Sequence, residues 1–177
     1  GIPAILLEER TVLWAMRALH SMGRMVTKKE QQTLLQLAGN AILRYPDALN
    51  GFQREPVSSA LKERHGVFVT LNLHHELRGC IGHLLPARPV YQSVMENAIN
   101  AAFHDPRFLP VTEEEMEDVE IEISILTDPV RLDCMDAKHL LTKLNPEEGL
   151  ILKKGTDTAT FLPQVWTQLP TPELFLA

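Results

Sequence analysis

Strict alternation of apolar and polar residues in DVEIEISIL, residues 118–126, constrains the fold more than any other feature of the chain. Successive side chains of a strand point to opposite faces, so this pattern is typical of a half-buried antiparallel strand. The apolar set is Val119, Ile121, Ile123 and Ile125, and the polar set is Glu120, Glu122 and Ser124. GVFVTLNL, residues 66–73, alternates in the same way, and the short HHE segment after it predicts a hairpin into LRGCIG, residues 77–82. The sequence therefore predicts a mainly antiparallel sheet.

Helical periodicity predicts the elements that flank this sheet. Thr27 and Glu30 form a capping box for a helix that ends near Tyr45, and Pro89 is typical of the first position of a helix over 89–103. Residues 133–144 also have helical spacing, and residues 5–22 are expected to form an amphipathic helix. Residues 149–161 predict two strands around a glycine turn, with helices beginning near Pro163 and Thr171. This order of elements indicates an α+β fold.

Composition narrows the classes of protein. A chain of 177 residues with 45% apolar residues fits one globular domain, and its net charge of −6 argues against binding to extended duplex DNA. Cys80 and Cys134 lack CxxC spacing, which indicates free thiols and a reducing, cytoplasmic location. No apolar run is long enough for a membrane span.

The LRGCIG segment is the strongest candidate site, and three hypotheses for it stay open. Strand alternation places Arg78, Cys80 and Gly82 on one face, where a guanidinium would favour a nucleophilic thiolate at Cys80. Alternatively, Gly79 and Gly82 clear the main chain for a ligand whose phosphate or carboxylate is gripped by Arg78. In the third hypothesis the segment only allows a helix to pack closely on the sheet. Binding is favoured over catalysis because no companion base has a diagnostic spacing.

Other polar residues offer weaker signals. Glu120 and Glu122 share a strand face and could act as an acid/base pair, bond to Arg78, or simply face solvent. Residues 104–107, His-Asp-Pro-Arg, follow a helix and could place an acid, a base or an anion-binding group at the edge of a cleft, or cap the loop. The adjacent histidines of HHE point in opposite directions on a strand, so no metal site is expected, and no cofactor is predicted.

Several strings together resemble one family. GVFVTL, LRGCIG, the long segment from RPVYQSV to EIEISIL and ATFLPQVWTQLP closely resemble the AMMECR family, in the family's own order. The resemblance covers residues 26–177 and leaves residues 1–25 as an extra N-terminal segment. Family members usually continue beyond ELFLA with another cysteine-containing segment, so the chain is expected to be truncated at its C-terminus.

The resemblance implies an α+β fold of two unequal subdomains that enclose a cleft lined by LRGCIG. It carries over Arg78, Gly79, Cys80, Gly82, Asp105, Arg107, Phe161, Pro163 and Gln164 as candidate site residues. The function it implies is a cytoplasmic binding or adaptor module for a nucleotide-like, nucleic-acid or peptide ligand, within a pathway that modifies a macromolecule. Memo-type dioxygenase-like and radical SAM proteins are the implied partners. An enzyme with Cys80 as nucleophile remains the alternative, with His104 or a glutamate as its base.

Overall fold

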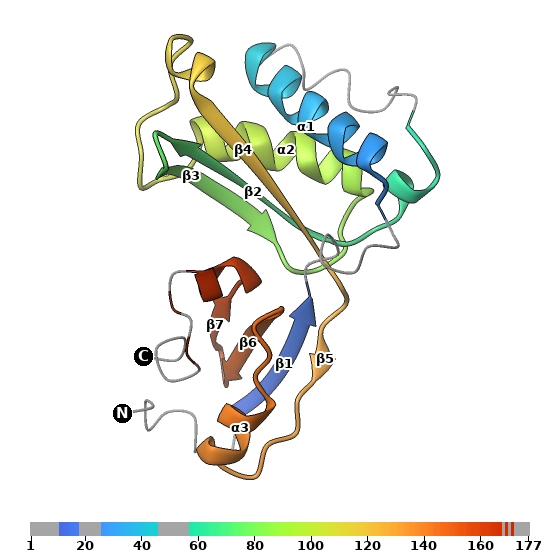
Figure 1. Ribbon diagram of the computed structural model, residues 1–177, viewed down its shortest axis with the longest axis vertical. Helices are drawn as coiled ribbons and strands as arrows, with labels where there is room; N and C mark the ends of the chain where they lie inside the picture. The colour runs from blue at the N-terminus through green and yellow to red at the C-terminus, as the bar shows by residue number, and fades with distance from the viewer. Residues whose placement is uncertain (1–10, 18–25, 46–56, 168, 170, 172–177) are drawn as a thin grey trace. The chain divides into compact units, whose positions relative to one another are not determined.

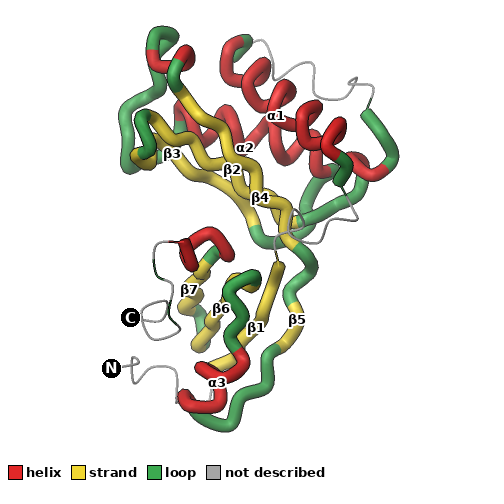
Figure 2. The backbone as a smooth tube through the Cα atoms, viewed as in Figure 1, coloured by secondary structure: helices red, strands yellow, loops and turns green. Residues whose placement is uncertain are grey.

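The computed structural model describes residues 11–17, 26–45, 57–167, 169 and 171 (Figure 1). The chain divides into two compact units, which are described separately: unit 1 combines residues 1–21 with 127–177, and unit 2 comprises residues 22–126. Helices and antiparallel strands occur in both, which confirms the α+β class (Figure 2).

A three-stranded antiparallel sheet forms the framework of unit 2. Its strands β2 (Gly66–Leu73), β3 (Glu76–His83) and β4 (Val119–Leu126) lie in the order β3-β2-β4. The predicted hairpin is confirmed, with Leu73 paired to Glu76 at its end. His74 and His75 form the turn with φ of 52° and 67°, the left-handed conformation that a two-residue hairpin turn requires.

The helices α1 (Lys28–Leu43) and α2 (Val90–Phe103) both cover one face of this sheet (Figure 1). The capping box of Thr27 and Glu30 is present as predicted. Apolar residues of β2 are fully buried on the covered face. Ile121 lies next to α1 on the same side, since a Cβ added to Gly39 would be 3.8 Å from its Cδ1. The opposite side, called the outer face below, carries Phe68, Thr70, Asn72, Cys80, Gly82, Glu120, Glu122 and Ser124.

The described residues of unit 2 also include two short 3-10 helices. One is η4 (Ala60–Lys62), and the other, η5 (Glu115–Glu117), stands between α2 and β4. Thr112 and Glu115 bond to each other's backbone N–H as a capping box. A capping box is typical of the start of a helix, and this one precedes the single turn of η5.

Unit 1 contains a four-stranded antiparallel sheet. Its strands β1 (Thr11–Arg17), β5 (Val130–Arg131), β6 (Glu148–Lys154) and β7 (Asp157–Phe161) lie in the order β5-β1-β6-β7. The predicted hairpin of β6 and β7 is confirmed, with Gly155 at φ 61° in its turn. The helix α3 (Ala137–Lys143), capped by Asp136, contributes to a core cluster of Leu13, Leu140, Leu150 and Trp166.

The N-terminal segment differs from its prediction. A helix was expected over residues 5–22, but residues 11–17 form β1, which lies between β5 and β6. Periodicity cannot separate a strand from a helix in so short an apolar run, and β-branched and aromatic residues favour the strand. Pairing with all seven residues of β6 then decides the outcome. Consequently residues 11–17 are internal to the sheet of unit 1.

The end of the chain also differs in part. The helix expected near Pro163 is the 3-10 helix η6 (Pro163–Thr167). The residues after Thr171, where the next helix was expected, lie outside the described part of the chain. Among the helices that the structure describes, none has the length and apolar character needed to cross a bilayer.

Candidate functional site

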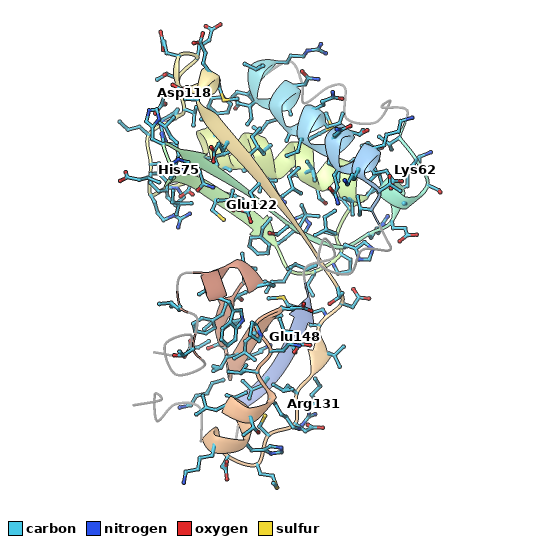
Figure 3. All side chains as sticks on the ribbon, in the orientation of Figure 1. Lys62, His75, Asp118, Glu122, Arg131 and Glu148 are labelled. Carbon is cyan, nitrogen blue, oxygen red and sulfur yellow. The ribbon has the colours of Figure 1, made fainter. Side chains whose placement is uncertain are left out.

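The thiol of Cys80 lies in a polar row on the outer face of unit 2. Thr70 pairs with Cys80 on one side and with Glu122 on the other, so the three residues form a line across the sheet. The Oγ1 of Thr70 donates a hydrogen bond to Cys80 Sγ at 3.3 Å. Cys80 is a free, half-buried cysteine, and Glu122 is exposed (Figure 3). The row thus presents a thiol, a hydroxyl and a carboxylate side by side.

Asp105 and Arg107 hold the main chain of Cys80 at the free edge of β3. The Cys80 N–H donates to Asp105 Oδ2 at 2.9 Å, and Arg107 Nη2 donates to the Cys80 carbonyl oxygen at 3.1 Å. Arg107 also donates to Asp105 from Nε at 2.9 Å and from Nη2 at 2.7 Å. The Asp105 side chain is 1% exposed and that of Arg107 is 53% exposed. Because the pair satisfies both main-chain groups of Cys80, it blocks further strand pairing at that position.

This ion pair sets the electrostatics beside the thiol. Hydrogen bonds from Arg107 hold the pKa of Asp105 far below its ordinary value, against the opposing effect of burial, and the Cys80 N–H adds to the shift. The pKa of Arg107 is raised, chiefly by its bonds to Asp105, with a smaller Coulombic contribution from Cys80. Both partners are therefore charged at neutral pH, and a guanidinium does lie close to Cys80.

The guanidinium predicted beside Cys80 was that of Arg78, whose bonds in the structure go to other groups. A β-bulge shifts the register here, since Leu71 pairs with Gly79 but Asn72 pairs with Leu77. Arg78 reaches away to Glu115 through two bonds, Nε to Oε1 at 2.8 Å and Nη2 to Oε2 at 3.0 Å.

Two main-chain carbonyl oxygens also accept hydrogen bonds from the guanidinium of Arg78. Nη1 donates to the Leu109 carbonyl at 2.8 Å and Nη2 to the Pro110 carbonyl at 3.3 Å. The bonds from Arg78 also lower the pKa of Glu115. Arg78 thus clamps the segment before β4, and the carboxylate that it bonds is Glu115 rather than Glu120 or Glu122. Its role as the anchor of a ligand stays a prediction.

Packing inside unit 2 explains the two glycines of the motif. A Cβ on Gly79 would lie 2.2 Å from the Ala101 carbonyl oxygen of α2, so glycine permits the helix to approach. A Cβ on Gly82 would lie 2.3 Å from Cγ of Phe68, whose ring fills that space on the outer face. Both positions support the hypothesis of close packing. At each glycine, the space that a side chain would occupy is filled by other protein atoms and is not open to a ligand.

The two histidines near the motif are engaged away from Cys80. His104, the predicted base, lies 3.2 Å from the Tyr45 hydroxyl. His83 faces α2, as alternation predicts: its Nδ1 lies 3.3 Å from Nδ2 of Asn97, and its Nε2 lies 3.2 Å from Oγ of Ser93. Asn97 Nδ2 is a donor, since it also bonds the Val67 carbonyl, so Nδ1 accepts and Nε2 carries the proton.

Three further candidates belong to unit 1. Phe161 packs against the core cluster of that unit, and Pro163 lies beside Gly149, whose added Cβ would come 2.9 Å from the proline Cδ. Gln164 is in η6, and its side chain lies outside the described part of the structure. Among the described residues, no group of three histidines, cysteines or carboxylates could hold a metal ion.

Sequence reasoning missed Thr70 and Phe68. The alternation of GVFVTLNL already places both on the face opposite the buried valines, so the pattern contained the signal. The LRGCIG segment alone does not reveal these two residues, because the partners of Cys80 come from the neighbouring strand and from the loop after α2.

Known proteins resemble this chain in both sequence and fold. The sequence model of the AMMECR1 family matches residues 35–177. A protein of Methanopyrus kandleri is 38% identical over 148 residues, which cover 81% of this chain and 72% of the relative. A protein of Pyrococcus furiosus is 40% identical over 140 residues, covering 75% of this chain and 66% of the relative. The crystal structure of an uncharacterized protein from Pyrococcus horikoshii matches with a TM-score of 0.74 and 34% identity, covering 85% of this chain and 78% of that one.

Proposed function

This chain belongs to the AMMECR1 family, and on that basis we propose that it is a cytoplasmic binding module whose outer face, around Cys80, recognises a peptide segment of a partner protein. The observation that carries the proposal is the polar row of Cys80, Thr70 and Glu122 on the face opposite both helices of unit 2. Neighbouring strands are about 4.8 Å apart, so a row across three strands suits an extended chain better than a small enclosed ligand.

Charge favours a peptide over a nucleotide or nucleic acid. The guanidiniums of Arg78 and Arg107 are bound to Glu115 and Asp105, while Glu120 and Glu122 add negative charge to the outer face. A phosphate would meet repulsion from these two glutamates without an uncommitted arginine to offset it. Memo-type dioxygenase-like and radical SAM proteins remain candidate sources of the peptide.

Thiol footprinting tests the proposal with a control inside the same chain. Peptides selected from a random library against the whole protein would be added during alkylation by iodoacetamide, and the rates at Cys80 and Cys134 measured by mass spectrometry. Bound peptide should slow alkylation of Cys80 but not that of Cys134, which belongs to unit 1. Failure to select any peptide, or equal slowing at both thiols, would contradict the proposal.

A second candidate is an enzyme that uses Cys80 as a nucleophile. The observation that favours it is the bond from Thr70 to Sγ together with the nearby Arg107, since both stabilise a thiolate. Burial raises the pKa of the Cys134 thiol, so Cys80 should be alkylated faster at neutral pH. Replacing Arg107 with glutamine should remove the advantage and replacing it with lysine should preserve part of it; equal rates in the wild-type protein would count against catalysis.

A further inference from the structure

The ring of Phe68 has a defined position on the outer face. Phe68 pairs with Gly82 across β2 and β3, and its Cγ and Cδ1 occupy the space within 2.4 Å of where a Cβ on Gly82 would stand. The ring therefore packs over the backbone of β3 and is partly exposed. An aromatic ring fixed on a sheet in this way can bind a flat group or a cation.

A carboxylate stands diagonally across from this ring. Glu122 pairs with Thr70, and Phe68 is the next residue of β2 on the same face. Diagonal neighbours on one sheet face are separated by about 7 to 8 Å between Cα atoms. The ring leans over β3 and Glu122 is on β4, so a long side chain that lies across β2 can contact both. Glu122 is exposed and makes no hydrogen bond or ion pair with other described residues, whereas Glu120 lies 4.0 Å from His75 (Figure 3).

Local charge selects the kind of group that fits there. The guanidiniums of Arg78 and Arg107 are each matched by a carboxylate, in the pairs Arg78–Glu115 and Arg107–Asp105. The negative charge of Glu122 is unmatched by any described cation, so it attracts a positive group and repels a negative one. Phe68 adds a ring whose electron-rich face also favours a cation.

From this juxtaposition we infer that the outer face recognises a basic side chain, lysine or arginine, of the partner peptide, held between the ring of Phe68 and the carboxylate of Glu122. The inference rests on the proposed function and adds the chemistry of the residue that is recognised. The ammonium or guanidinium bonds to Glu122 while its alkyl stem or its plane lies on the ring. The thiol of Cys80, in the same row as Glu122, lies beside the bound peptide.

Sequencing of the selected peptides provides the first test. Peptides that slow alkylation of Cys80 should share a lysine or arginine at one position. Replacing an arginine at that position with citrulline, which keeps the shape but removes the charge, should weaken binding about tenfold, a change that corresponds to one charged contact. Dissociation constants would be measured by fluorescence anisotropy on the full chain.

Variants of the protein make the test specific. Glu122→Gln should weaken the arginine peptide about tenfold and leave the citrulline peptide unchanged, and Phe68→Leu should weaken the arginine peptide. The matched control is Glu113→Gln, which removes the charge of another exposed glutamate of unit 2 and should change nothing. Glu122 is on the surface, so its loss does not threaten folding, and urea midpoints would verify that Phe68→Leu stays folded.

The outcomes separate the two proposals. If selected peptides protect Cys80 but lack a basic residue, or bind Glu122→Gln as well as the wild type, the proposed function stands and the present inference is overturned. If no peptide protects Cys80, the proposed function fails and the inference falls with it.

Discussion

Replacing Asp105 with asparagine should destabilise unit 2 although the side chain keeps its shape. The carboxylate is 1% exposed and accepts bonds from the Cys80 N–H, the Arg107 N–H and two guanidinium nitrogens. Loss of a bond to a charged group costs about 1.5 to 3 kcal/mol, and breaking a buried ion pair costs about 3 to 5 kcal/mol. Arg107 is half exposed and can be solvated again, so we expect the lower range, about 2 to 3 kcal/mol.

Urea unfolding followed by far-ultraviolet circular dichroism measures this effect, because both long helices, α1 and α2, belong to unit 2. Fluorescence of Trp14 and Trp166 reports separately on unit 1. Asp118→Asn, at an exposed position of unit 2, is the matched control and should leave the midpoint unchanged (Figure 3). An Asp105→Asn variant that unfolds at the wild-type urea concentration would refute the stabilising role assigned to the bonds of Asp105 with Cys80 and Arg107.

The pH dependence supplies an independent check on the same residue. The folded protein lowers the pKa of Asp105, so its contribution to stability is complete above the ordinary aspartate pKa of about 3.9 and is lost as pH falls through the lower, folded value. The difference in unfolding free energy between wild type and Asp105→Asn should therefore be largest near neutral pH and shrink in acid. A difference that stays constant from neutral pH to strong acid would contradict the direction of this pKa shift.

Three further predictions follow from the geometry. Glu115→Gln removes the charged partner of Arg78 and should lower the unfolding free energy by about 1 to 2 kcal/mol, as measured in urea, because both side chains are only partly exposed. Gly79→Ala should lower the free energy of unfolding much more than Gly155→Ala. The added methyl group at residue 79 meets the carbonyl oxygen of Ala101, whereas the one at residue 155 meets open space and only strains a left-handed backbone conformation. Equal losses of stability would contradict the packing argument. The His83 ring should donate from Nε2 and accept at Nδ1 from Asn97, which nitrogen-15 chemical shifts of the ring would report.

Local patterns in the sequence predicted unit 2 well. Alternation in β2 and β4, the capping box of α1 and the hairpin between β2 and β3 each depend on residues close together in the chain. The same approach was wrong for residues 11–17, because their strand is decided by pairing with β6, far away in the sequence. A short apolar run does not carry that information.

The site was predicted less completely, and for a physical reason. The sequence placed an arginine beside Cys80 but chose Arg78, since period-two geometry cannot reveal a bulge that turns this side chain toward Glu115. Arg107 was identified as a site residue, yet its bond to the Cys80 carbonyl depends on how the loop after α2 returns to the edge of β3.

The structure gives most of LRGCIG a role in the fold. Its arginine and both glycines stabilise the fold, because Arg78 clamps a loop, Gly79 admits α2 and Gly82 accommodates the ring of Phe68. What remains on the outer face is the Cys80 thiol, with neighbours supplied by β2 and β4. If the proposed peptide binding holds, a substitution of Arg78 that abolishes it would report a displaced loop. Substitutions of Phe68 and Glu122 would change the proposed binding surface and leave the bonds of Arg78 intact. Experiments that aim to identify the ligand should start from those two residues.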